Sequence, residues 1–205
     1  TRIRTTDDVE NISDAPVLAS VARNTASPEA KDEDGSSRGV QWANAEAYRK
    51  LRTSIGFVGL GGERRSSMVI TSSIQGEGKT ETAINLSRVL AQAGERVLLI
   101  DADLRRPQVG PRLGLDSELG LSDVLTGRVD LEDVLIDADG DYFKVLAAGT
   151  VPPNPSELLG SEAMAHLLAL TERQYDYVIL DAPPLLPVTD SVVPVSYTHL
   201  RAHET

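Results

Sequence analysis

The stretch Ser72-Ser-Ile-Gln-Gly-Glu-Gly-Lys-Thr-Glu81 decides the fold of this chain. It follows the apolar run Met68–Thr71, which is typical of a strand, and it leads into a helical pattern. A glycine-rich turn between a strand and a helix presents backbone N–H groups and the positive end of the helix dipole to an anion. Lys79 would reach the outer phosphates of a nucleotide, and the Thr80 hydroxyl would hold magnesium. The sequence therefore predicts a phosphate-binding loop.

The loop departs from the plain pattern G-x-x-x-x-G-K-[ST] at its first position, where this chain has Ser73. A lone Gly-Lys-Thr also occurs by chance in ordinary turns before helices. The nucleotide interpretation therefore depends on two further motifs, each of which follows a predicted strand. We expect a bound nucleotide to contact the second half of the loop, which comprises Gly76, Glu77, Gly78, Lys79, Thr80 and Glu81.

Composition limits the classes of protein to consider. At 205 residues the chain has room for one α/β domain and some extra length. Its formal net charge of -11 repels nucleic acid, so we expect no nucleic-acid partner. It contains no cysteine, which excludes a disulfide framework and favours a reducing compartment. No apolar run approaches the roughly 20 residues that cross a bilayer.

The chain divides into four segments by composition. Residues 1–39 are polar and acidic and predict a flexible linker. Residues 40–65 predict a helical arm, and residues 66–194 predict a core in which strands and helices alternate. Residues 195–205 resemble the translation of a sequencing adapter, so we exclude them from fold reasoning. We accordingly expect the natural protein to continue past Pro194.

The core segment predicts a parallel sheet. Apolar runs predict further strands at 96–101, 142–146 and 177–181, and helical patterns lie at 80–93, 123–125, 131–136 and 162–173, with a helix start at Asn154-Pro155. Buried strands that alternate with helices are typical of a sheet covered on both faces. The expected fold is therefore α/β, a P-loop NTPase-like three-layer sandwich with a parallel sheet, truncated at its C-terminus. Ligands of such sheets bind beyond the carboxyl ends of the strands.

Two carboxylates, Asp101 and Asp103, follow the second core strand. Residues two apart in extended backbone point to the same side, so we expect both to face the nucleotide end of the sheet. One carboxylate could orient magnesium or its waters. The other could accept a proton from an incoming hydroxyl, a role that contributes about 10²–10⁴-fold in rate. A solvated pair that caps a turn is an equally good interpretation of these two residues alone.

A third carboxylate, Asp181, ends the predicted strand 177–181 and is followed by Ala-Pro-Pro. An isolated aspartate at a strand end is more often a turn former. In a chain with a phosphate-binding loop, however, an acid at this place is the expected neighbour of magnesium. The loop upstream therefore favours the magnesium interpretation.

In this order the motifs resemble the cytoplasmic kinase domain of the bacterial tyrosine kinases of capsule and exopolysaccharide synthesis. That family carries a modified Walker A loop, a Walker A′ segment and a strand that ends in Asp-x-Pro-Pro. The matching segments here are 73–80, 100–107 and 181–184, and the hallmark-like segments are 152–159 and 186–190.

The resemblance implies ATP and Mg²⁺ as cofactors, transfer of a phosphoryl group to protein tyrosines, autophosphorylation, and control of polymer synthesis and chain length. Lys79 and Thr80 match the Walker A positions, and Asp181 matches the Walker B acid. Asp101 and Asp103 match the Walker A′ carboxylates, and Asp101 is the expected base for the tyrosine proton. The implied catalytic residues are Asp101, Asp103 and Lys79, and the implied metal ligands are Thr80, Asp103 and Asp181.

The predicted arm helix carries Glu46, Arg49 and Arg52 near one face. Such a charged stripe is usually a solvated face with internal salt bridges. In the family that the chain resembles, a Glu-x-x-Arg-x-x-Arg element at this place joins subunits into a ring, so a homo-oligomer is expected. The resemblance also implies a membrane-anchored chain-length regulator, fused upstream or separate, and a place on the cytoplasmic side of the cell membrane.

Two alternatives stay open at this point. One is an ATPase switch of the chromosome-partitioning type, whose relatives carry a signature lysine early in the loop. This chain has Ile74 at that position, which argues against that class. The other is a non-catalytic nucleotide-binding scaffold of the polysaccharide export machinery.

Overall fold

The computed structural model describes residues 16–22, 36–58, 66–138, 140 and 142–185. Most of the predicted linker, the hallmark-like segment 186–190 and the adapter-like segment 195–205 lie outside the described residues. The chain forms two compact units, Thr1–Gly62 and Glu63–Thr205.

The first unit contains one described helix, α2, which spans Ser36–Val58. It begins before the predicted arm and extends two residues past the Trp42–Gly56 segment that looks helical in the sequence. Residues 16–22 have no regular secondary structure, and the Ser54 hydroxyl donates a hydrogen bond of 3.0 Å to the carbonyl of Leu18. None of the described helices combines the length and the apolar character needed to cross a membrane.

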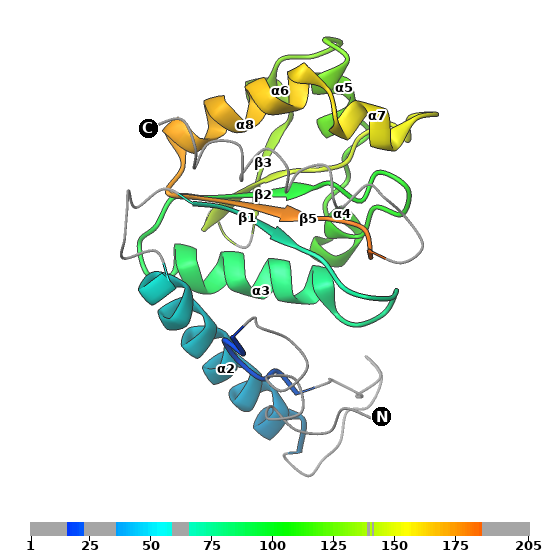
Figure 1. The fold of residues 1–205 in the computed structure, drawn as a ribbon. Helices are drawn as coiled ribbons and strands as arrows, with labels where there is room; N and C mark the ends of the chain where they lie inside the picture. The colour runs from blue at the N-terminus through cyan, green and yellow to red at the C-terminus, as the bar shows by residue number, and fades with distance from the viewer. Residues whose placement is uncertain (1–15, 23–35, 59–65, 139, 141, 186–205) are drawn as a thin grey trace. The chain divides into compact units, whose positions relative to one another are not determined.

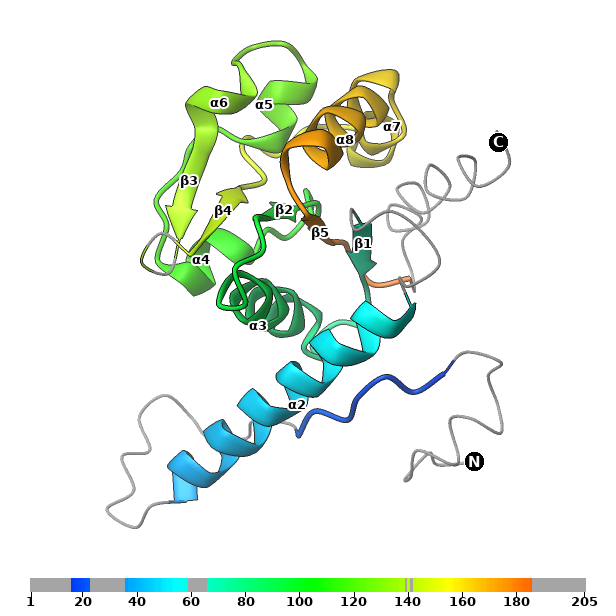
Figure 2. The same ribbon diagram turned by 90° about the vertical axis from the view of Figure 1, so that its left-hand side faces the viewer.

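The second unit is built on a five-stranded sheet in the order β1-β5-β2-β4-β3 (Figure 1). Its strands are β1 (Ser66–Ile70), β2 (Val97–Asp101), β3 (Leu135–Ala138), β4 (Phe143–Leu146) and β5 (Tyr177–Asp181). The pairs β1·β5, β5·β2 and β2·β4 are parallel, whereas β3 pairs with β4 antiparallel. Figure 2 shows β3 at one edge of the sheet and β1 at the other.

Helices cover both faces of this sheet, which confirms the expected three-layer α/β fold (Figure 1). The helix α3 (Lys79–Ala91) packs against one face, on β1, β2 and β5. The other face is covered by α5 (Leu121–Leu125), α6 (Leu131–Val134), α7 (Pro155–Leu159) and α8 (Glu162–Gln174). A further short helix, α4 (Val109–Leu113), was not predicted from the sequence.

The edge strand β3 differs from the prediction, which placed residues 131–136 in one helix. The helix α6 ends at Val134, and Leu135 adopts extended backbone. Leu135 and Ile136 then pair with Leu146 and Val145 of β4, the next strand along the chain, and this antiparallel pairing keeps them extended. Antiparallel edge strands on otherwise parallel sheets are common in this class of fold.

The burial of the strands on both faces of the sheet explains why their sequences are unbroken apolar runs. Every residue of β2 is buried, and Leu98, Ile100 and Leu180 are each at most 1% exposed. Full burial of one such side chain contributes about 1.5–3 kcal/mol. The parallel register sets Asp101 directly opposite Asp181, so the carboxyl ends of β2 and β5 reach the same level of the sheet. The phosphate-binding loop follows β1, the other neighbour of β5, at that edge.

Candidate active site

The loop between β1 and α3 has a backbone that requires glycine at two places. Gly76 and Gly78 have φ values of 86° and 91°, in the left-handed region where a side chain would be strained. Gly78 is the residue that precedes helix α3, and no side chain caps the helix there. The first N–H groups of α3 are therefore available to an anion, as the sequence predicted for a phosphate-binding loop.

The Glu77 side chain organises the first half of this loop. Its Oε2 atom accepts hydrogen bonds from the N–H groups of Ser73 (2.8 Å) and Ile74 (3.2 Å). The carboxylate thus bonds to the part of the loop in which the usual first glycine is replaced by Ser73. A contact between the Glu77 backbone and a phosphate stays a prediction.

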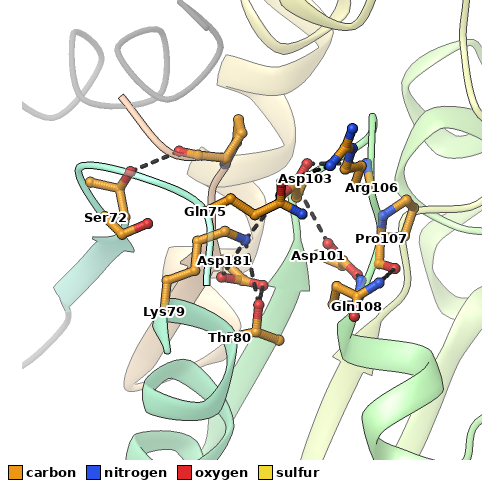
Figure 3. Close-up of polar contacts among 12 residues, drawn as sticks. Ser72, Gln75, Lys79, Thr80, Asp101, Asp103, Arg106, Pro107, Gln108 and Asp181 are labelled. Carbon is orange, nitrogen blue, oxygen red and sulfur yellow. Dashed lines mark hydrogen bonds and ion pairs between the residues drawn. The ribbon is translucent and has the colours of Figure 1, made fainter. Parts of the chain in front are cut away.

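Lys79, Thr80, Asp103 and Asp181 converge at the carboxyl edge of the sheet (Figure 3). Lys79 Nζ lies 3.0 Å from Asp103 Oδ2 and 3.2 Å from Asp181 Oδ1. The Thr80 hydroxyl donates a hydrogen bond of 2.6 Å to Asp181 Oδ2. The side chains of Lys79, Asp103 and Asp181 are 10%, 7% and 0% exposed. The strand order β1-β5-β2 brings them together, because each follows or ends one of three adjacent strands.

This cluster has the chemistry that a magnesium ion requires. Two carboxylates and a hydroxyl are hard oxygen donors, which Mg²⁺ prefers, and Mg²⁺ usually takes only one or two carboxylates together with waters and substrate phosphates. Within the part of the chain that the structure describes, no group of three or more His, Cys, Asp or Glu residues forms a metal site. Water and substrate phosphates would therefore have to supply the remaining ligands of a magnesium ion here. Burial raises the pKa of Asp181, and the nearby charge of Lys79 and the Thr80 hydrogen bond oppose that rise. A cation at this point would favour the ionised form.

Asp101 lies in different surroundings from Asp103. Its carboxylate is fully buried and accepts hydrogen bonds from the backbone N–H groups of Asp103 (3.2 Å), Gln108 (3.0 Å) and Val109 (2.9 Å). The pKa of Asp101 is raised to about 7, because burial and, less strongly, the charge of Asp181 raise it more than the Val109 hydrogen bond and the other backbone hydrogen bonds lower it. The two carboxylates therefore have different partners, since Asp103 contacts Lys79 whereas Asp101 bonds the backbone of residues 103–109. That both face a bound nucleotide stays a prediction.

A pocket of about 980 Å³ opens beside this cluster. Asp103 lines it, whereas Asp101 is not among its lining residues. Besides the loop residues, its walls carry three arginines and two apolar segments. Most of these residues lie in the segments 100–107, 152–159 and 181–184, but the sequence analysis gave them no role in the site. The arginines are Arg105, Arg106 and Arg112, and the apolar residues are Val151, Pro152, Pro153, Pro155, Pro183 and Pro184. The runs Arg-Arg-Pro and Pro-Pro in the sequence were the available signals.

Two polar contacts cross from the phosphate-binding loop and α3 to the segment after β2. Arg106 Nη1 donates a hydrogen bond of 2.7 Å to Gln75 Oε1. Arg112 Nη1 lies 3.2 Å from Glu81 Oε2. The Glu81 carboxylate pairs with Arg112 in the structure, and a contact between Glu81 and a nucleotide stays a prediction.

The predicted oligomerisation residues belong to the other unit and take no part in this cluster. Arg49 Nη1 lies 3.2 Å from Glu46 Oε2 on an exposed face of α2, which is the local salt bridge that the spacing predicted. A role of Glu46, Arg49 and Arg52 in subunit contacts stays a prediction.

A further buried carboxylate, Asp123, fixes the backbone that leads into the apolar segment 151–155 of the pocket. It accepts hydrogen bonds from the N–H groups of Gly120 and Thr150 and from the Thr150 hydroxyl, at 3.1–3.2 Å, and Arg128 lies 2.8 Å away. Gly120 and Gly149 lie so close together that a Cβ on Gly149 would approach the nitrogen of Gly120 to 2.5 Å. The Asp123 hydrogen bonds and the close approach of Gly120 and Gly149 therefore fix the position of Thr150, the residue before Val151.

The surroundings of Asp123 predict a pH dependence of stability. Burial alone would raise its pKa, but the Thr150 and Gly120 hydrogen bonds and the Arg128 charge together lower it. A carboxylate whose pKa is lowered on folding stabilises the protein above its ordinary pKa of about 3.9, and that contribution is lost as the pH falls through the lowered value. We expect the difference in unfolding free energy between wild type and Asp123→Asn to be largest above pH 4 and to shrink below it. Urea unfolding between pH 3 and pH 7 measures this difference, and a difference that grew as the pH fell would contradict the account.

Comparison with known proteins points to one family. A model described as AAA domain matches residues 67–195. The chain is 43% identical to tyrosine-protein kinase YwqD of Bacillus subtilis over 73% of its own length and 63% of the relative's length. It spans only about a fifth of longer relatives such as the putative tyrosine-protein kinase AmsA of Erwinia amylovora, with which it shares 42% identity over 72% of its own length. Among solved structures, the BceF tyrosine kinase domain is similar with a TM-score of 0.76 and 32% identity, covering 93% of this chain and 81% of that one.

Proposed function

We propose that this chain, which belongs to the bacterial tyrosine kinase family, transfers the terminal phosphoryl group of ATP to protein tyrosines. The observation that supports this most is the convergence of Lys79, Thr80, Asp103 and Asp181 beside a loop whose helix start is uncapped. The regulation of capsular or exopolysaccharide synthesis is part of the same proposal.

Phosphoryl transfer depends mainly on positioning and on electrostatic stabilisation, because the transition state is loose and its charge spreads over the phosphoryl oxygens. In this proposal the N–H groups of the loop hold the phosphates, and Lys79 contacts the outer ones. Thr80 and Asp181 would hold magnesium, which would supply further positive charge at the phosphates. Asp103, which the resemblance also implies as a metal ligand, would stay free of the metal in this proposal. Lys79 Nζ, which now lies between two carboxylates, turns toward the phosphate when the nucleotide binds.

The acceptor hydroxyl loses its proton during transfer. Asp103 lines the pocket and is the carboxylate that an acceptor can reach, so we assign proton acceptance to Asp103. Asp101 is fully buried and bonds three backbone N–H groups of the segment 103–109. We therefore assign Asp101 a positioning role, through the segment that carries Asp103, in place of the role of base that the resemblance implied.

The partners and the division of the chain are also proposals. We propose that α2, with Glu46, Arg49 and Arg52, joins subunits in a homo-oligomeric ring, and that residues 1–39 link the kinase core to a membrane-anchored chain-length regulator. The core would then lie at the cytoplasmic side of the cell membrane. The exposure of Glu46 and Arg49 on α2 supports a contact surface there.

Transfer of label from γ-labelled ATP to this chain and to a tyrosine-containing peptide tests the proposed function. We expect acid-stable label on tyrosine that requires magnesium. Release of free phosphate without labelled tyrosine would instead indicate an ATPase switch. Nucleotide binding with neither product would indicate a scaffold.

A further inference from the structure

The pocket has two chemically different walls. One carries the phosphate-binding loop with Lys79 and Thr80, and Asp103 lies next to it. The other is apolar and consists of Val151, Pro152, Pro153, Pro155, Pro183 and Pro184. The phosphate-binding chemistry described above uses the first wall and leaves the second without a function.

We propose that this apolar wall packs against the aromatic ring of the acceptor tyrosine. The inference rests on the proposed function and adds to it the place where the second substrate binds. Val151 is 60% exposed and lines the pocket, so its apolar side chain can contact a ligand there.

The place of the reacting atoms puts the acceptor ring in this pocket, whose volume of about 980 Å³ lies at the upper end of the range of about 300–1,000 Å³ typical of small-molecule pockets. A tyrosine hydroxyl has to come within about 3–3.5 Å of the phosphorus atom that it attacks, so its ring must lie in the same pocket as Lys79 and Asp103. The adenine of ATP is separated from the terminal phosphate by a ribose and two further phosphates and has no such constraint.

The wall is rigid before any ligand binds. Pro152, Pro153 and Pro155 have fixed φ angles, and the buried carboxylate of Asp123 holds Thr150 immediately before the wall. A preformed surface loses little conformational entropy when a flat ring packs on it, so the affinity for the ring is higher.

The cationic side of the pocket predicts which tyrosines are preferred. Arg105, Arg106 and Arg112 line the pocket of a chain whose formal net charge is -11. Positive charge around an acceptor site attracts acidic residues next to the tyrosine. We therefore expect peptides with Asp or Glu beside the tyrosine to have a lower KM than neutral ones, and a difference that disappears in high salt.

Steady-state kinetics of Val151→Asp test the proposal, with ATP and a single-tyrosine peptide as the varied substrates. A carboxylate on the wall disfavours an apolar ring, so we expect the KM for the peptide to rise at least tenfold while the KM for ATP changes less than twofold. Leu119→Asp is the matched control, because Leu119 is an exposed apolar residue outside the pocket, 38% exposed, and we expect both constants to stay at the wild-type values.

The outcomes separate this inference from the proposed function. A rise in the KM for ATP alone would assign the wall to adenine, and unchanged constants for both substrates would leave the wall without a ligand. Either result overturns the inference while wild-type transfer to tyrosine still supports the kinase function. The melting temperature of Val151→Asp is measured alongside. If it falls, Val151→Ser gives the same comparison with a smaller perturbation, and an unchanged peptide KM there would also contradict the proposal.

Discussion

Replacement of Lys79 by methionine is expected to reduce transfer of phosphate to tyrosine by at least about 10²–10³-fold, the usual effect of removing one preorganised donor from developing negative charge. The Lys79 ammonium group lies 3.0 Å from Asp103 and 3.2 Å from Asp181 and is almost completely buried. Methionine keeps most of the length of the side chain and removes the ammonium group with its charge and hydrogen-bond donors. Initial rates at saturating ATP and magnesium give the effect.

Two measurements make this result specific. Lys50→Met, on the exposed surface of α2, removes one positive charge from the other unit and is expected to leave the rate unchanged. The melting temperature of Lys79→Met shows whether the two carboxylates, which lose the ammonium group between them, weaken the fold. A Lys79→Met protein that melts like the wild type and keeps more than a tenth of the wild-type rate would contradict the role assigned to Lys79.

The two carboxylates after β2 are expected to respond differently to the same substitution. Asp103→Asn should lower kcat by about 10²–10⁴-fold, since it removes the group assigned to the acceptor proton. Asp101→Asn places an amide N–H₂ against three backbone donors, so we expect a loss of about 1–3 kcal/mol in stability and weaker binding of nucleotide together with a lower rate. Its remaining activity should keep the wild-type pH profile.

The pH profile and the stability together decide between the two assignments. If Asp101 were the base, Asp101→Asn would lose the acidic limb of the profile and keep the wild-type melting temperature and nucleotide affinity. That outcome would return the role of base to Asp101. Measurement of kcat and kcat/KM between pH 5 and pH 9, with urea unfolding of the same proteins, covers both possibilities.

Local signals in the sequence predicted much of the core. The strands β2 and β5 are buried on both faces, so their apolar runs identified them to within a residue, and Gly76, Gly78 and Lys79 identified the loop. The strand β3 was missed because Leu135 and Ile136 continue the apolar pattern of α6, and only pairing with β4 makes them extended. Pairing with a neighbouring strand, which the local apolar pattern does not show, decides the conformation of such a segment.

The site was predicted less completely than the core, for a related reason. The sequence predicted that Lys79, Thr80 and Asp181 lie at one edge of the sheet, because the carboxyl ends of parallel strands meet there. It gave no means to separate Asp101 from Asp103, since strand alternation stops where the strand ends and the backbone turns to bond the Asp101 carboxylate. The apolar wall is formed from residues after β4 and after β5, which the sheet brings together, so no local pattern could assign them to one surface.

A crystal structure of this chain with magnesium and a non-hydrolysable ATP analogue tests the central claim most directly. The account predicts phosphates against the N–H groups at the start of α3, and a metal about 2.0–2.1 Å from the Thr80 hydroxyl with Asp181 beside it. It also predicts that Lys79 Nζ leaves the two carboxylates and contacts the terminal phosphate. A nucleotide bound elsewhere, or Lys79 still held between Asp103 and Asp181 with the phosphates in place, would contradict it.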